Sequence, residues 1–81
     1  MCHMTLPISE IELRTRFAQN LRTLRGAQGL SQEALADIAG VHRTFVSQVE
    51  RGLKSLSLDS IRKLANALGV DPLELFRPRD N

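Results

Sequence analysis

The sequence has a single cysteine, no tryptophan or tyrosine, and only three prolines among its 81 residues. One cysteine cannot form a disulfide within the chain, and neither a Cys-x-x-Cys nor a His-Glu-x-x-His motif is present. Its uninterrupted apolar runs are too short for a transmembrane helix. The N-terminal residues do not show a positively charged region followed by an apolar stretch, which is the pattern of a secretory signal. These absences exclude a disulfide framework and a membrane span.

The length and the charge leave room for one small domain with a folded binding surface. Leu, Ile, Val and Phe make up about 30% of the chain, above the roughly 20% below which chains tend to stay disordered. Eleven Lys and Arg against nine Asp and Glu give a net charge of +2, which tolerates an anionic partner without requiring one. Because there is no long basic tail, any contact with nucleic acid must come from a folded surface.

The N-terminal end carries three residues, Met1, Cys2 and His3, before a second methionine. They are either a remnant of cloning or a native start, and neither interpretation gives Cys2 a role. We expect an N-terminal segment over residues 1–8, a domain over residues 9–76 and a polar tail over residues 77–81.

The spacing of the apolar residues predicts helices and no strand, because they recur every three or four residues and nowhere alternate with polar ones. The first predicted helix spans residues 9–28 and ends before Gly29. A second follows the N-cap Ser31 and ends at Gly40, and a third covers residues 43–51. The residues expected to face inward from the first two helices are Leu13, Phe17, Leu21, Leu24, Leu35, Ile38 and Ala39.

Two further helices complete the expected fold. The fourth begins after Ser57 and ends at Gly69, and its inward stripe comprises Leu58, Ile61, Leu64, Ala65 and Leu68. Asp71, Pro72 and Glu74 provide an acidic cap, a proline at the first helical position and a capping-box glutamate, and they predict a short fifth helix through Phe76. The predicted fold class is therefore all-α, a compact domain of five helices.

The second and third helices fit a helix-turn-helix, in which a turn of three or four residues often contains glycine. Here the turn is Gly40, Val41 and His42, and Gly40 can adopt the positive φ that a tight turn requires. Ala36 is small where the helices must cross closely. Apolar residues stand where the pair must share a core, at Leu35, Val41, Val46 and Val49.

The third helix has two faces when it is drawn at about 100° per residue. Its apolar face comprises Phe45, Val46 and Val49, and its polar face comprises Arg43, Thr44, Ser47, Gln48 and Arg51. Arginine pairs with guanine, glutamine with adenine, and serine or threonine with several base edges. This acid-free face therefore favours the reading of DNA bases, and an ordinary solvated face is the alternative.

From Leu13 to Phe76 the chain resembles Cro/C1-type helix-turn-helix domains. The resemblance rests on Leu-Ser-Gln-Glu-Ala-Leu-Ala at residues 30–36, Val-Glu-Arg-Gly at 49–52 and Leu-Ala-Asn-Ala-Leu-Gly-Val at 64–70. It implies a lambda-repressor-like DNA-binding fold. The segment His-Arg-Thr-Phe-Val-Ser at residues 42–47 is similar to the recognition segment of restriction–modification controller proteins, although other single-domain regulators share this pattern.

The resemblance also implies residue roles. Gln32 matches a glutamine that holds a DNA phosphate, and Arg25 and Glu50 match an internal salt bridge, whose alternative is two unpaired surface charges. His42 departs from the usual Ser or Thr cap, so it either accepts the cap hydrogen bond, faces a phosphate or is a partly exposed turn residue. The expected base-reading residues are Arg43, Thr44, Ser47 and Gln48, and the expected phosphate contacts are Gln32, His42, Arg51, Lys54 and Ser55.

A dimer is expected because one recognition helix reads too few base pairs for useful specificity. The expected interface comprises Val70, Leu73, Leu75 and Phe76, and the alternative is that all four complete the core of one chain.

Catalysis is not expected, because the two histidines and one cysteine form no catalytic or metal-ligating arrangement. A protein-interaction module, such as an antitoxin, is the main alternative, but only five residues follow Phe76 as a possible extension.

The sequence thus predicts a cytoplasmic, nucleoid-associated homodimer that regulates transcription by binding palindromic operators in double-stranded DNA. If it activates, RNA polymerase is a further partner. We expect no cofactor, no metal, no small-molecule ligand and no membrane partner. The operator sequence and the sign of regulation stay open.

Overall fold

The structure is a computed structural model that describes residues 7–78. Residues 1–3, whose origin the sequence left open, and residues 79–81 of the expected tail lie outside the described residues. The described chain forms α1 (Glu10–Ala27), α2 (Gln32–Ala39), α3 (Arg43–Glu50), α4 (Leu58–Leu68) and the 3-10 helix η1 (Pro72–Phe76). The all-helical class is therefore confirmed, with no strand among the described residues.

Three of the described helices, α1, α2 and α4, begin where a serine side chain accepts a backbone N–H group. Ser9 accepts from Glu12 N–H at 3.0 Å, and the Glu12 carboxylate accepts the Ser9 N–H at 3.0 Å, which completes a capping box on α1. Ser31 accepts from Ala34 at 2.9 Å and Ser57 from Ser60 at 3.0 Å, so the caps predicted for α2 and α4 are both formed.

The fifth element differs from the prediction, because residues 72–76 form a 3-10 helix and the chain has four α-helices in its described part. Asp71 caps it by accepting from Leu73 N–H at 2.8 Å, as expected. Glu74 does not close a capping box, because both of its oxygens accept from Arg77, at 2.8 and 3.1 Å. The segment is too short for a regular α-helix, and Pro78 disfavours helical geometry at the residue before it.

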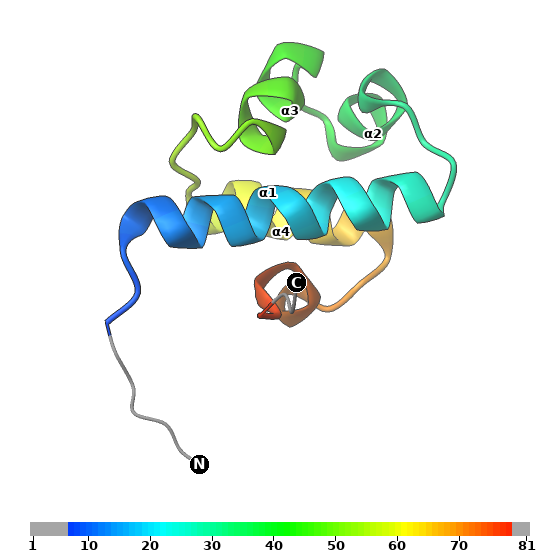
Figure 1. Ribbon diagram of the computed structural model, residues 1–81. Helices are drawn as coiled ribbons and strands as arrows, with labels where there is room; N and C mark the ends of the chain where they lie inside the picture. The colour runs from blue at the N-terminus through cyan, green and yellow to red at the C-terminus, as the bar shows by residue number, and fades with distance from the viewer. Residues whose placement is uncertain (1–6, 79–81) are drawn as a thin grey trace.

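One continuous core joins all five elements. Its buried members are Phe17, Leu21, Leu35, Ala36, Val46, Val49, Leu64, Ala65, Leu68 and Leu75. In Figure 1, α2 and α3 lie together on one side of α1, and η1 lies on the opposite side. α1 contacts both α3 and η1, so it connects the two sides of the domain. α2 contacts α4. None of the described helices combines the length and the apolar character that crossing a membrane requires.

Three residues expected to face inward do not do so. Ile38 is 59% exposed, Leu58 is 86% exposed and Leu13 is 36% exposed. On α2, Leu35, Ala36 and Ala39 point toward the core, and at about 100° per residue Ile38 lies well to one side of that direction. Leu58 is the first residue of α4, where no neighbouring element covers it.

Candidate nucleic-acid interface

The turn between α2 and α3 is built as the motif requires. Gly40 ends α2 with φ 75° and ψ 35°, a left-handed conformation that glycine adopts without a steric penalty. The next N–H, from Val41, donates to the Ala36 carbonyl at 2.9 Å. Ala36 is only 2% exposed, which leaves no room there for a larger side chain. The turn therefore fixes α3 firmly on α2.

The two faces of α3 are separated as predicted. Val46 and Val49 are buried in the core, and Phe45 packs partly against it. Arg43 and Thr44 are exposed, and Ser47 and Gln48 are half-buried on the outer face. Within residues 7–78 these four outer side chains make no hydrogen bond or ion pair, so their donors and acceptors are available to a partner.

His42 is the N-cap of α3, with extended backbone at φ −77° and ψ 146°, but its side chain makes no cap hydrogen bond. The first of the three roles considered for this residue, acceptance of the cap bond, is therefore not observed. The ring is exposed beside Arg43 at the start of the helix.

Glu50, the last residue of α3, is a charged residue that is almost fully buried, with only 2% of its surface exposed. Its carboxylate accepts two hydrogen bonds from Arg25, from Nε at 2.6 Å and from Nη2 at 2.9 Å. The remaining Arg25 nitrogen, Nη1, donates to the Leu30 carbonyl at 2.8 Å. The expected ion pair is thus formed and ties α1 to α3 and to the loop before α2.

Opposing effects set the ionisation of Glu50. Burial alone raises its pKa, but hydrogen bonds from Arg25 and Gln32 and the positive charges of Arg25 and Arg22 lower it. The net pKa of Glu50 lies below its ordinary value of 4.5, and the same contact raises the pKa of Arg25. The pair is therefore fully charged near neutral pH.

Gln32 takes part in this cluster as well as standing at the start of α2. Its Nε2 donates to Glu50 Oε1 at 3.0 Å. An amide nitrogen carries two hydrogens, so one N–H of Gln32 remains for a phosphate. The link between Gln32 and Glu50 was not expected from the sequence, because residues 18 positions apart have no local signal.

The remaining expected phosphate contacts are exposed but differ in their surroundings. Arg51 and Lys54 are exposed in the segment that follows α3, and their side chains make no hydrogen bond to the described residues. Ser55 is already bonded, since its Oγ accepts from Arg14 Nη2 at 2.7 Å and donates to Glu10 at 3.3 Å. Ser55 must therefore give up these bonds before its hydroxyl can contact a phosphate, whereas the side chain of Lys54 need not.

Sequence reasoning missed several residues that anchor separate segments of the fold to one another. Arg22 donates to the backbone carbonyl of Glu50 at 2.6 Å. Asn20 is buried and donates to the carbonyls of Leu75 and Arg77, at 3.0 and 2.9 Å. The i,i+4 spacing of Glu10 and Arg14 was a visible signal for their ion pair, but the tertiary partners of the others had none.

The expected dimer residues fall into two groups. Leu75 is fully buried within one chain and has no surface for a partner, so its assignment to the interface was wrong. Phe76 is half-buried, with its ring centroid 5.2 Å from that of Phe17. Val70 is also half-buried, whereas Leu73 is 73% exposed. Of the four, Leu73 alone offers most of its side chain to a second copy.

Known proteins resemble this chain in sequence and in fold. The helix-turn-helix family model HTH_3 matches residues 21–75. The control protein C.BamHI of Bacillus amyloliquefaciens is 44% identical over 65 residues, covering 79% of this chain and 80% of that protein. The crystal structure of the restriction–modification controller protein C.AhdI from Aeromonas hydrophila is 52% identical, with a TM-score of 0.76, covering 78% of this chain and 96% of that one.

A second solved structure extends the likeness over almost the whole chain. It is the hypothetical transcription factor NHTF from Neisseria, 43% identical with a TM-score of 0.80, covering 94% of this chain and 91% of that one. The chain therefore belongs to the HTH_3 family of Cro/C1-type helix-turn-helix transcriptional regulators, and its relatives include restriction–modification control proteins.

Proposed function

We propose that the protein acts as a restriction–modification controller, which binds palindromic operators in double-stranded DNA as a homodimer. The observation that carries this proposal is the outer face of α3. Four polar side chains stand there without partners in the described chain, on a helix that the Gly40 turn and the Glu50 ion pair hold in place. Rigidly presented, unpaired polar groups are what a base-reading surface needs, because bound bases must replace water.

We assign base reading to Arg43, Thr44, Ser47 and Gln48. Arg43 is the first residue of α3, and the N-terminal residues of a recognition helix reach the base edges. Its guanidinium presents two parallel donors that match O6 and N7 of guanine. Gln48 is five residues further along the helix, about one and a half turns, and presents the donor and acceptor that match adenine.

We assign phosphate contacts to Gln32, His42, Arg51, Lys54 and Ser55. These residues flank α3 at both ends, so contacts from them would fix the helix across the groove without reading sequence. Gln32 uses the N–H that Glu50 leaves unused, and Lys54 contributes a charge that no described residue neutralises. Ser55 reaches a phosphate only by exchanging its bonds to Arg14 and Glu10.

We place the dimer contact on η1, through Leu73 with the exposed parts of Val70 and Phe76. In Figure 1 η1 lies on the side of α1 opposite to α2 and α3, so a copy docked there leaves α3 uncovered. Two copies would then present two recognition helices to successive major grooves. A controller of this kind works on DNA in the cytoplasm, and at an activated promoter it also contacts RNA polymerase.

The proposal is tested by selecting bound sequences from random duplexes with the purified protein. We expect a symmetric consensus whose half-sites are about one helical turn apart, roughly 10–10.5 base pairs from centre to centre. Enrichment of no sequence would contradict the DNA-binding role and favour a protein-interaction module such as an antitoxin. An asymmetric single half-site would retain DNA binding but contradict the dimer.

A further inference from the structure

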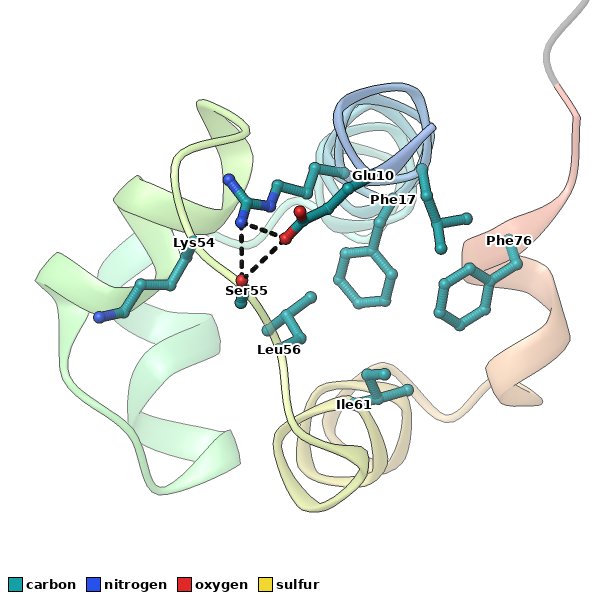
Figure 2. A pocket seen from close by; sticks show the side chains of 9 residues that line it. Glu10, Phe17, Lys54, Ser55, Leu56, Ile61 and Phe76 are labelled. Atoms are coloured by element: carbon teal, nitrogen blue, oxygen red, sulfur yellow. Dashed lines mark hydrogen bonds and ion pairs between the residues drawn. The ribbon is translucent and has the colours of Figure 1, made fainter. Parts of the chain in front are cut away.

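Three side chains, from α1 and from the loop that follows α3, meet in one hydrogen-bonded cluster. Arg14 Nη2 donates to Glu10 Oε2 at 2.5 Å and to Ser55 Oγ at 2.7 Å. Ser55 Oγ in turn donates to the same Glu10 oxygen at 3.3 Å. The dashed lines in Figure 2 mark these bonds, at the edge of an apolar cavity of about 210 Å³. Leu56, the residue after Ser55, packs against the core and keeps the loop beside α1.

Glu10 Oε2 lies where two donors converge on one anionic oxygen. A guanidinium N–H and a serine hydroxyl are also donors that proteins direct at the phosphate oxygens of DNA. The ion pair of Glu10 and Arg14 is local, because residues four apart lie on one face of a helix, but the link from Arg14 to Ser55 spans 41 positions. The fold thus brings together two donors for an anion, and the carboxylate of Glu10 has the contacts that a phosphate oxygen would make there.

The cluster is open to solvent on the side of Glu10. The side chain of Glu10 is 71% exposed, so it can turn into water at little cost, whereas that of Arg14 is only 30% exposed. Arg14 Nη1 makes no hydrogen bond within residues 7–78, and unlike Nε it is not buried. When Glu10 turns away, Arg14 therefore keeps its place on α1 and has Nη1 and Nη2 available to another anion.

We propose that Arg14 and Ser55 form a phosphate site for the DNA backbone, and that Glu10 occupies this site in the free protein. The inference rests on the proposed function, in which Ser55 reaches a phosphate by exchanging its bonds. The same exchange frees Arg14, so one phosphate takes both donors. Lys54 precedes Ser55, and in Figure 2 its side chain points away from Glu10, which leaves its charge for a neighbouring phosphate. Glu10 is thus an internal competitor that weakens binding to every DNA sequence alike.

Glu10→Gln tests the competition, because it keeps the size of the side chain and removes its charge. We expect its affinity for mixed-sequence duplex DNA at low salt to rise by about twofold to fivefold for each subunit bound, the strength of a solvent-exposed ion pair. Glu12→Gln is the matched control, since it removes the same charge from the same end of α1 and glutamine preserves the capping box. The control should show only the smaller gain that follows from net charge. Equal gains in the two variants would overturn the proposal.

Arg14→Met tests the phosphate contact, because it removes the donors and keeps an unbranched apolar stem. It should weaken DNA binding and lower the slope of log K against log salt concentration by about 0.9 for each phosphate that is no longer neutralised. Arg16→Met loses the same charge but lies about 200° further around α1, and it should leave the slope unchanged. With Arg14→Met already present, Glu10→Gln should give no more gain than Glu12→Gln, because the two residues act as one unit. An unchanged slope for Arg14→Met, or a gain from Glu10→Gln that persists without Arg14, would overturn the proposal.

Circular dichroism establishes that each variant is folded, and Ser55→Ala keeps the test decisive if Arg14→Met does not fold. Ser55→Ala changes no charge and should weaken binding to mixed-sequence DNA, so an unchanged affinity would overturn the site. A wild-type protein without any affinity for DNA would refute the proposed function and this inference with it. DNA binding in which Glu10→Gln matches Glu12→Gln would refute this inference alone.

Discussion

Replacing Glu50 by glutamine should remove much of the stability of the domain. The glutamine keeps the size of the side chain but takes the negative charge from Arg25, whose own side chain is only 18% exposed. Breaking one side of a buried, hydrogen-bonded pair costs roughly 3–5 kcal/mol, because the other charge stays buried and uncompensated. The whole domain, at about 0.05–0.15 kcal/mol per residue, has roughly 4–12 kcal/mol to lose.

Thermal unfolding followed by circular dichroism measures this loss. For a domain of roughly 60–100 residues, about 3 kcal/mol corresponds to a fall in Tm of about 12–24 °C. The matched control is Asp59→Asn, which breaks the ion pair between Asp59 and Arg62. The side chains of Asp59 and Arg62 are 60% and 59% exposed. Water screens that pair, so the control should melt close to the wild type. If Glu50→Gln and Arg25→Ala both melt no lower than the control, Glu50 does not hold α3 to α1.

The same carboxylate predicts a pH dependence with a definite sign. The pKa of Glu50 is lowered in the folded state, so its contribution is complete above the ordinary value of 4.5 and disappears as the pH falls through the lower folded value. The difference in unfolding free energy between the wild type and Glu50→Gln should therefore shrink in acid. A difference that stays constant down to about pH 2 would show that the charge of Glu50 is not what stabilises the fold.

Three further changes test separate parts of the molecule. Lys54→Ala should weaken binding to all DNA sequences alike. The slope of log K against log salt concentration, measured by titrations at several salt concentrations, should fall by about 0.9 for each phosphate that the variant no longer neutralises. A changed consensus sequence would contradict this role for Lys54. Leu73→Glu should dissociate the dimer in sedimentation while helical content is kept, whereas Ile11→Glu, at the same 73% exposure, should leave assembly unchanged; a fall in helicity would instead place Leu73 in the fold. Asn20→Ala leaves the carbonyls of Leu75 and Arg77 without their donor and should cost about 1–3 kcal/mol in urea unfolding, and a neutral result would show that water replaces it.

Local signals in the sequence predicted the elements that depend on neighbouring residues. The caps at Ser31 and Ser57 and the left-handed Gly40 involve atoms only a few residues apart, so residue type and spacing suffice to place them. The outer and inner faces of α3 follow from helical periodicity in the same way. The Arg25–Glu50 pair spans 25 positions, and it was reached through resemblance to a family and not through spacing.

The errors arose where tertiary packing decides the outcome. Leu75 was assigned to the dimer because η1 carries more apolar residues than a short helix can bury by itself. In the structure Leu75 is fully buried within one chain, where η1 packs on α1 and α4. Leu58 fits the apolar stripe of α4 but lies at its uncovered end. The bonds from Gln32 to Glu50 and from Arg14 to Ser55, and the cavity beside them, join segments that no local pattern relates.

The central claim is that the outer face of α3 reads bases, and Arg43→Lys tests it most directly. Lysine keeps the charge but loses the planar pair of donors that matches guanine. The measurement is the affinity of the wild type and of Arg43→Lys for every single-base change in one half-site of the selected operator. We predict that Arg43→Lys keeps non-specific binding and loses about 1–3 kcal/mol of discrimination at one symmetric pair of G·C positions only. If it weakens binding to all sequences equally and leaves the consensus unchanged, Arg43 contacts phosphate, and the account of base reading by α3 is contradicted.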